Sequence, residues 1–144
     1  MLKNSLKYFA IFVVLITAFS FKPAETFNLK NIKPFIGIWN NTTNPGTQMI
    51  IKSDGSFFTI VKEKDVRTIT HSGFIKVLSG NIYAQVISYA LPNSTYDLKG
   101  RQYAIQYTFN KDKQTLKQSG FVEGKNGLKG ISWSEELIKT DHID

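Results

Sequence analysis

Apolar and polar residues alternate in short runs from Ile36 onward, with hardly a helical period among them. The clearest run is 102–109, in which alternate positions carry large apolar side chains. Successive side chains of a strand point to opposite faces of a sheet, so a period of two indicates a half-buried β-strand. By this pattern we expect eight strands, at residues 36–41, 47–52, 56–62, 66–78, 82–90, 102–109, 115–124 and 128–138.

Turn residues separate these runs. Asp54-Gly55 and Asn126-Gly127 each stand between two apolar runs, which is the strongest short-range signal for a β-hairpin. Gly73 lies in the middle of the long fourth run and predicts a bulge or sharp bend. The longest connection covers residues 91–100. The other connections have hairpin length, so we expect consecutive strands to pair in antiparallel fashion.

Eight antiparallel strands in sequence order can close on themselves and remove both sheet edges. The predicted fold is therefore all-β, an eight-stranded antiparallel up-and-down β-barrel of the lipocalin-like kind. At this strand number the interior is either filled by side chains or holds one small ligand. Two packed sheets built from the same strands are the alternative that the pattern leaves open.

The first 20 residues have the features of a signal peptide. Lys3 and Lys7 give a basic start, residues 8–19 form an apolar segment, and Ala18 and Ser20 supply small residues at the two positions that a signal peptidase reads. The apolar segment is shorter than the roughly 20 residues that span a bilayer, so we expect cleavage, export and no stable membrane insertion afterwards. An uncleaved N-terminal anchor is the alternative.

The remaining chain divides into a tether at 21–31, one barrel domain at 32–140 and a tail at 141–144. The sequence contains no cysteine, so the fold is held without disulfides, and a bacterial periplasm or cell surface is the favoured location. The formal net charge is +7, or +5 without Lys3 and Lys7. Lysines are spread along the chain and Arg67 and Arg101 are its two arginines, a pattern that argues against nucleic-acid binding.

Catalytic and metal-binding patterns are not evident. His71 and His142 are far apart and have no cysteine partners, so we predict no metal site and no cofactor. Glu135 and Glu136 are adjacent in a strand and face opposite sides, so they cannot act together across a cleft. One of the two can point into the barrel as a single buried acid. We expect a protein that is not an enzyme.

Aromatic and amide side chains mark a candidate ligand-binding wall. Tyr83 and Gln85 share a face of the fifth strand, and Tyr103 and Tyr107 share a face of the sixth. Neighbouring strands pair directly, so these faces should lie side by side. If they face inward, they form an apolar wall with polar tips that suits a ring-containing ligand. The alternatives are that these residues merely fill the core, or that a one-residue slip turns the tyrosines to solvent.

A short motif at residues 34–39 places Gly37 two residues before Trp39 at the start of the first strand. We expect Trp39 to plug one end of the barrel and Gly37 to permit a close backbone approach, both as structural closure residues.

Together with residues 51–57, 70–74, 81–85 and 134–139, this motif resembles a lipocalin-like, calycin-type family of unknown function in secreted proteins of Bacteroidetes. The resemblance covers about residues 32–140 and implies a barrel that binds a small molecule. Lipocalins also place an arginine near the end of the barrel over the early tryptophan, whereas the last strand here has Lys139.

We therefore expect an exported barrel that binds a small apolar or amphipathic ligand. The alternative is a non-catalytic interaction module that contacts an envelope protein or a glycan through its loops, 91–100 above all.

Overall fold

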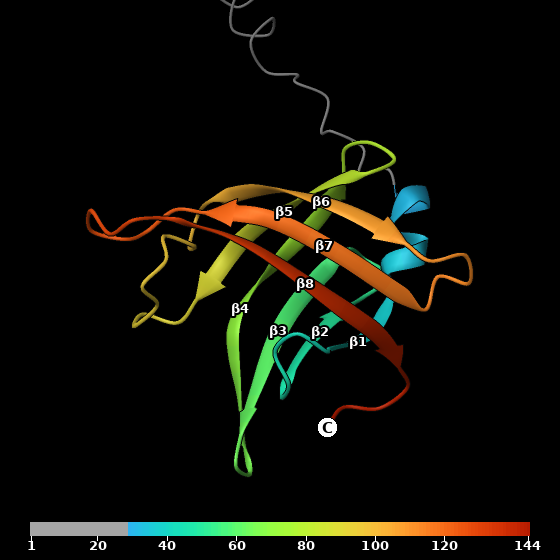
Figure 1. Cartoon of the computed structure of the whole chain (residues 1–144), viewed down its shortest axis with the longest axis horizontal. Coiled ribbons are helices and arrows are strands. Elements are labelled where there is room, and N and C mark those ends of the chain that lie inside the picture. The colour runs from blue at the N-terminus through green and yellow to red at the C-terminus, as the bar shows by residue number, and fades with distance from the viewer. Residues whose placement is uncertain (1–28) are drawn as a thin grey trace, which may run out of the picture.

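The computed structural model describes residues 29–144 and forms a closed barrel in which eight antiparallel strands follow one another in sequence order (Figure 1). A 3₁₀ helix, η1 (Leu29–Phe35), precedes the first strand. The strands are β1 (Gly37–Asn41), β2 (Thr47–Ile51), β3 (Ser56–Glu63), β4 (Val66–Val77), β5 (Ile82–Ala90), β6 (Gln102–Phe109), β7 (Thr115–Val122) and β8 (Ile131–Thr140). The predicted up-and-down barrel is confirmed. The predicted signal peptide at 1–20 and residues 21–28 of the predicted tether lie outside the described residues.

The first and last strands close the barrel. Trp39 of β1 pairs with Met49 of β2 on one side and with Lys139 of β8 on the other. Both edges of the sheet are therefore satisfied, and the alternative of two separate packed sheets does not apply.

Gly73 marks an irregularity in β4, as the sequence predicts. The register between β4 and β5 shifts between Ser72 and Gly73. A Cβ atom at Gly73 would lie 1.9 Å from the carbonyl oxygen of Val86, so the backbone of β5 occupies the space that any other side chain needs. This close approach of the two backbones explains why residue 73 is a glycine.

Two hairpin turns form at the predicted dipeptides. Gly55 has a φ of 84° between β2 and β3. Asn126 and Gly127 have φ values of 55° and 78°, which a type I′ turn requires at both central positions. The turn and the segment after it delay the last strand, which begins at Ile131 and not at Leu128 as the alternation predicted.

The helix η1 was not predicted. Its Ile32 and Phe35 are 1% and 0% exposed and belong to the hydrophobic core. They are three residues apart, which places them on one face of a helix with three residues per turn. The predicted boundary between tether and barrel domain, at residues 31 and 32, instead falls inside this helix. Within residues 29–144 no helix has the length and apolar character that crossing a membrane demands.

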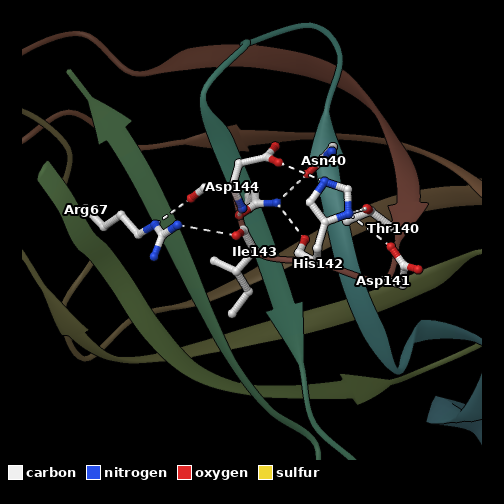
Figure 2. Close-up of polar contacts among 8 residues, drawn as sticks. Asn40, Arg67, Thr140, Asp141, His142, Ile143 and Asp144 are labelled. Carbon is white, nitrogen blue, oxygen red and sulfur yellow. Dashed lines mark hydrogen bonds and ion pairs between the residues drawn. The ribbon is translucent and has the colours of Figure 1, made fainter. Parts of the chain in front are cut away.

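The tail at 141–144 folds back onto the outside of the barrel (Figure 2). Gln48 of β2 donates to the carbonyl oxygen of His142 at 3.2 Å and accepts from the backbone N–H of Asp144 at 3.0 Å. Arg67 of β4 donates to the carbonyl oxygens of Ile143, at 3.3 Å, and Asp144. The tail thus covers Gln48, which is 4% exposed, and links β8 to strands on the far side of the β1–β8 seam.

His142 is held within this tail by two acids. Its Nδ1 lies 3.0 Å from Asp141 and its Nε2 lies 3.0 Å from Asp144 (Figure 2). The hydrogen bond with Asp141, together with the negative charge of Asp144, raises the pKa of His142 above its ordinary value. The two histidines of the chain therefore do not form a common site, since His71 lies on β4 and faces the barrel interior.

Candidate functional site

The barrel contains a cavity of about 440 Å³. It lies toward the end opposite η1, where Figure 1 shows the β5–β6 and β7–β8 connections. The cavity volume falls within the range typical of small-molecule sites. Its walls come from all eight strands and from two connections, and they comprise Asn41, Asn44, Thr47, Met49, Thr59, Val61, Thr70, His71, Gln85, Ile87, Tyr96, Leu98, Tyr103, Ile105, Gln118, Val122, Trp133, Glu135 and Leu137.

Below the cavity, a cluster of aromatic rings fills the end of the barrel next to η1. Phe35 makes edge contacts with Tyr83 and Tyr107, with ring centroids 5.2 and 4.8 Å apart. Phe109 packs against both Phe35 and Trp39. We call these five residues the aromatic floor. Edge-to-face packing of this kind stabilises aromatic clusters beyond the area that they bury.

Trp39 is completely buried in the aromatic floor, and its Nε1 donates to the carbonyl oxygen of Phe35 at 2.7 Å. The indole thus fixes the end of η1 to β1. Lys139 lies over the ring, with its Nζ 5.3 Å from the ring centroid, in the place that the lipocalin resemblance gives to an arginine.

Gly37 is required here by its own backbone conformation, and not by the close backbone approach that was predicted. Its φ is 140°, which residues with a side chain rarely adopt. A Cβ atom would also lie 2.6 Å from Cε of Lys139, near the flexible end of that side chain. The close neighbour is therefore a side chain that crosses the glycine to reach Trp39, and not a second backbone.

The inward faces of β5 and β6 lie side by side, as predicted. Gln85 pairs with Tyr103 across the two strands, and Tyr83 pairs with Ile105. Tyr83, Gln85 and Tyr107 are 0%, 8% and 9% exposed, so the register that turns the tyrosines to solvent is excluded.

The structure divides the four predicted wall residues into two pairs. Gln85 and Tyr103 line the cavity. Tyr83 and Tyr107 also point inward, but they belong to the aromatic floor. The Tyr107 hydroxyl donates to the carbonyl oxygen of Ser79 at 3.2 Å, and the Tyr103 hydroxyl donates to that of Asp97.

A chain of hydrogen bonds runs from the aromatic floor into the cavity wall. Gln85 Nε2 lies 3.4 Å from the Tyr83 hydroxyl, which donates to Oε1 of Gln118 at 2.6 Å. Gln118 Nε2 then donates to Oε1 of Glu135 at 2.5 Å, and Asn41 Nδ2 donates to Oε2 of Glu135 at 2.5 Å. We call these five residues the polar network. It supplies the partner that a buried Gln85 amide needs.

Burial keeps the Tyr83 hydroxyl protonated. Desolvation, with a contribution from the negative charge of Glu135, raises the pKa of Tyr83 well above its ordinary value. A neutral hydroxyl donates one proton, and that proton goes to Gln118. At the buried end of the polar network, Tyr83 is therefore the donor and Gln118 the acceptor.

His71 contributes a neutral imidazole to the opposite part of the wall. Its Nδ1 lies 3.0 Å from Thr70 Oγ1 and its Nε2 lies 3.3 Å from Thr59 Oγ1. Burial lowers the pKa of His71 to about 4, because the charged form loses its hydration. Residues 29–144 contain no group of three or more His, Cys, Asp or Glu side chains placed to hold a metal ion.

Sequence reasoning identified Glu135 or Glu136 as a possible inward acid, and the structure selects Glu135. Glu136 instead faces outward and forms an ion pair with Lys117 at 3.2 Å. Asn41 and Gln118 were missed. Gln118 lies two residues after the buried Leu116, so a polar residue on an apolar face was the signal available. Asn41 was assigned to the end of a strand, and its inward direction was not considered.

The β5–β6 connection lies over the cavity and contributes Tyr96 and Leu98 to its lining. It is attached to the β7–β8 connection by backbone hydrogen bonds, from Asp97 N–H to Glu123 at 3.0 Å and from Lys125 N–H to Thr95 at 2.8 Å. The longest connection of the chain is thus part of the cavity wall.

The fold and site define a class: a closed eight-stranded antiparallel barrel with an aromatic floor and a partly polar interior cavity, consistent with a lipocalin-like fold. A family model described as "Domain of unknown function (DUF4488)" matches residues 35–140, and the chain belongs to this family. No curated protein matches the chain. The matched segment begins within η1 and ends with β8, so it contains the complete barrel.

Proposed function

We propose that this protein binds a small amphipathic molecule inside its barrel and does so without catalysing a reaction. The observation that carries the proposal is the cavity of about 440 Å³ lined by apolar side chains together with Gln85, Gln118 and Glu135. Ligand sites combine a largely apolar lining with a few placed polar groups in this way.

The aromatic floor supports the proposal, because it concentrates bulky core side chains at one end of the barrel. Trp39, Tyr83 and Phe35 are 0% exposed, so the barrel is held together below the cavity. The rest of the barrel can then be lined by smaller and polar side chains, because the aromatic floor keeps the close packing of the core.

Binding of N-phenyl-1-naphthylamine, a neutral dye that fluoresces in apolar sites, tests the proposal. Val61 lines the cavity, and Val61→Trp should fill part of it and weaken dye binding. The neighbouring Lys62 is exposed, so Lys62→Trp is the matched control and should leave dye binding unchanged. Equal dye affinity in both variants and the wild type, or no dye binding by the wild type, would contradict the proposal.

We also propose that the protein is exported to the periplasm or the medium, and that it is distantly related to the lipocalin-like, calycin-type family of secreted Bacteroidetes proteins. The support for export is the basic and then apolar pattern of residues 1–20. The mass of the protein recovered from its own host decides whether cleavage occurs. A mature chain that still begins at Met1 would argue against cleavage.

A further inference from the structure

Glu135 is distinctive among the residues that line the cavity. The lining contains one carboxylate and no lysine or arginine in the described part of the chain. Within residues 29–144, His71 is the one histidine that lines the cavity, and its imidazole is neutral at pH values above its lowered pKa of about 4. Among the described residues, the cavity lining therefore holds a single carboxylate and no cationic side chain, although the chain as a whole is basic.

The carboxylate of Glu135 is held in place by neutral donors. Gln118 contacts one carboxylate oxygen and Asn41 contacts the other, each at 2.5 Å. Each amide is itself fixed, because Gln118 Oε1 accepts from Tyr83 and Asn41 Oδ1 accepts from the backbone N–H groups of residues 43 and 44, at 2.9 and 2.8 Å. A carboxylate offers about four acceptor positions, so two remain for a further donor.

The amides orient this charge without neutralising it. Among residues 29–144, the ion pairs of the carboxylates involve Asp97, Glu136, Asp141 and Asp144, and none of them involves Glu135. A partly buried carboxylate is most stable with an opposite charge beside it.

Aromatic side chains in the same wall can also receive a cation. Trp133 lies two residues before Glu135 on the same inward face of β8 and packs against Gly120, where a Cβ atom would be 3.1 Å from the indole. Tyr96 and Tyr103 line the cavity as well. Tryptophan and tyrosine rings attract ammonium groups within about 6 Å of the ring centroid.

We propose that the barrel ligand is a small organic cation, a protonated amine or a quaternary ammonium with an apolar body, whose charged group lies against Glu135 and Trp133. The apolar body packs against Met49, Ile87 and Ile105, which line the cavity. This inference rests on the proposed function, since it names the ligand class for the same cavity.

A matched pair of probes tests the inference. Phenylbutylamine and phenylbutanol have the same apolar body and nearly the same size, and they differ in whether the polar end is charged at neutral pH. Isothermal titration of the wild-type protein should give an affinity for the amine at least about tenfold higher, because a charge-assisted hydrogen bond is about twice as strong as a neutral one. Equal affinities, or a preference for the alcohol, would overturn the cation inference.

Two variants with the same change of charge locate the effect. Glu135→Gln should abolish the preference for the amine over the alcohol. Glu136→Gln, in which the altered side chain faces outward beside Lys117, should keep the preference. A preference that survives in Glu135→Gln would contradict the proposed site. Comparison of the two compounds in the wild type does not depend on whether either variant folds.

The result also separates this inference from the proposed function. If the alcohol and the neutral dye bind as well as the amine, the barrel binds ligands but the cation inference fails. If neither compound nor the dye binds, both fail together. Binding of the dye together with a preference for the amine over the alcohol supports both, provided that Val61→Trp weakens the binding of the dye and of the amine.

Discussion

Lys139 lies across Gly37 and places its Nζ 5.3 Å from the centroid of the Trp39 ring. Three residues from the two strands that close the barrel thus form one unit: the glycine makes room, the lysine crosses it and the indole receives the charge. Trp39 and Lys139 are also directly paired between β1 and β8. The contact therefore stabilises the seam at which the barrel closes.

Replacing Lys139 with Met should lower the free energy of unfolding by about 0.5–1 kcal/mol, since the apolar stem is kept and the cation–π contact is lost. Lys139→Arg should retain the stability, because a guanidinium also stacks on an indole. Urea denaturation measures both. A Met variant as stable as the wild type would mean that the charge above the ring contributes nothing.

Trp39→Ala should cost about 3–5 kcal/mol of stability, the range for truncation of a fully buried large aromatic side chain. The indole is 0% exposed and also anchors the Phe35 carbonyl of η1. Thermal unfolding followed by circular dichroism checks this. An unchanged melting temperature would place Trp39 outside the core.

Tyr83→Phe should lower the stability by about 1–3 kcal/mol, although it keeps the aromatic ring in the floor. The change leaves the buried Oε1 of Gln118 without its donor at 2.6 Å. A double-mutant cycle with Gln118→Leu isolates the hydrogen bond, since the two substitutions together remove both partners. Strictly additive effects would show that the two side chains do not interact.

Gly73→Ala should destabilise the barrel by about 1–3 kcal/mol or more, because the new methyl group meets the Val86 carbonyl oxygen and rigid backbone must move. Gly80→Ala is the matched control, since nothing lies within 4 Å of the added atom. It should change stability by no more than about 0.5 kcal/mol. Similar losses in the two variants would contradict the close approach of β4 and β5.

The two histidines should titrate on opposite sides of their ordinary pKa of 6.5. Burial lowers the pKa of His71 to about 4, whereas Asp141 and Asp144 raise that of His142. His71 is neutral in the folded protein and is protonated more readily in the unfolded chain. Its contribution to the free energy of unfolding is therefore complete above pH 6.5 and is lost as the pH falls toward 4. For His142 the sign is reversed: its contribution is present below pH 6.5 and is lost as the pH rises through its higher folded value.

Nuclear magnetic resonance titration of the two imidazole rings measures both shifts in one experiment. Denaturation of His71→Gln at several pH values then tests the linkage, since this variant should lose less stability than the wild type between pH 6.5 and 4. A His71 ring that titrates near 6.5 would show that it is hydrated in solution.

Much of the barrel could be predicted from the sequence because each strand carries its own signal. Period-two alternation defined the strands, and Asp54-Gly55 and Asn126-Gly127 defined hairpins through the positive φ that their turns need. Gly73 was assigned to a bulge or sharp bend, and the register between β4 and β5 shifts there, but the close approach of the β5 backbone was not predicted. The helix η1 was missed because a short 3₁₀ helix places only Ile32 and Phe35 in the core, and two positions do not establish a period.

The candidate site was predicted only in part, since alternation tells which face is inward but not how deep a residue lies. Tyr83 and Tyr107 were correctly predicted to point inward, but their position along the barrel axis places them in the aromatic floor and not in the cavity wall. That position depends on η1, which fills the same end. The partnership of Asn41, Gln118 and Glu135 depends on strands far apart in sequence, so no local pattern contains it.

The pairing of β1 with β8 has a consequence for how the chain folds. Asn41 and Leu137 are neighbours in the finished barrel, so nearly the whole domain must be available before the ring can close. Folding rates fall as contacting residues lie farther apart in sequence, and barrels of this kind fold in milliseconds to seconds, more slowly than helical domains. A growing chain that lacks residues 131–140 keeps two open sheet edges, and only the arrival of the last strand converts it into the native protein.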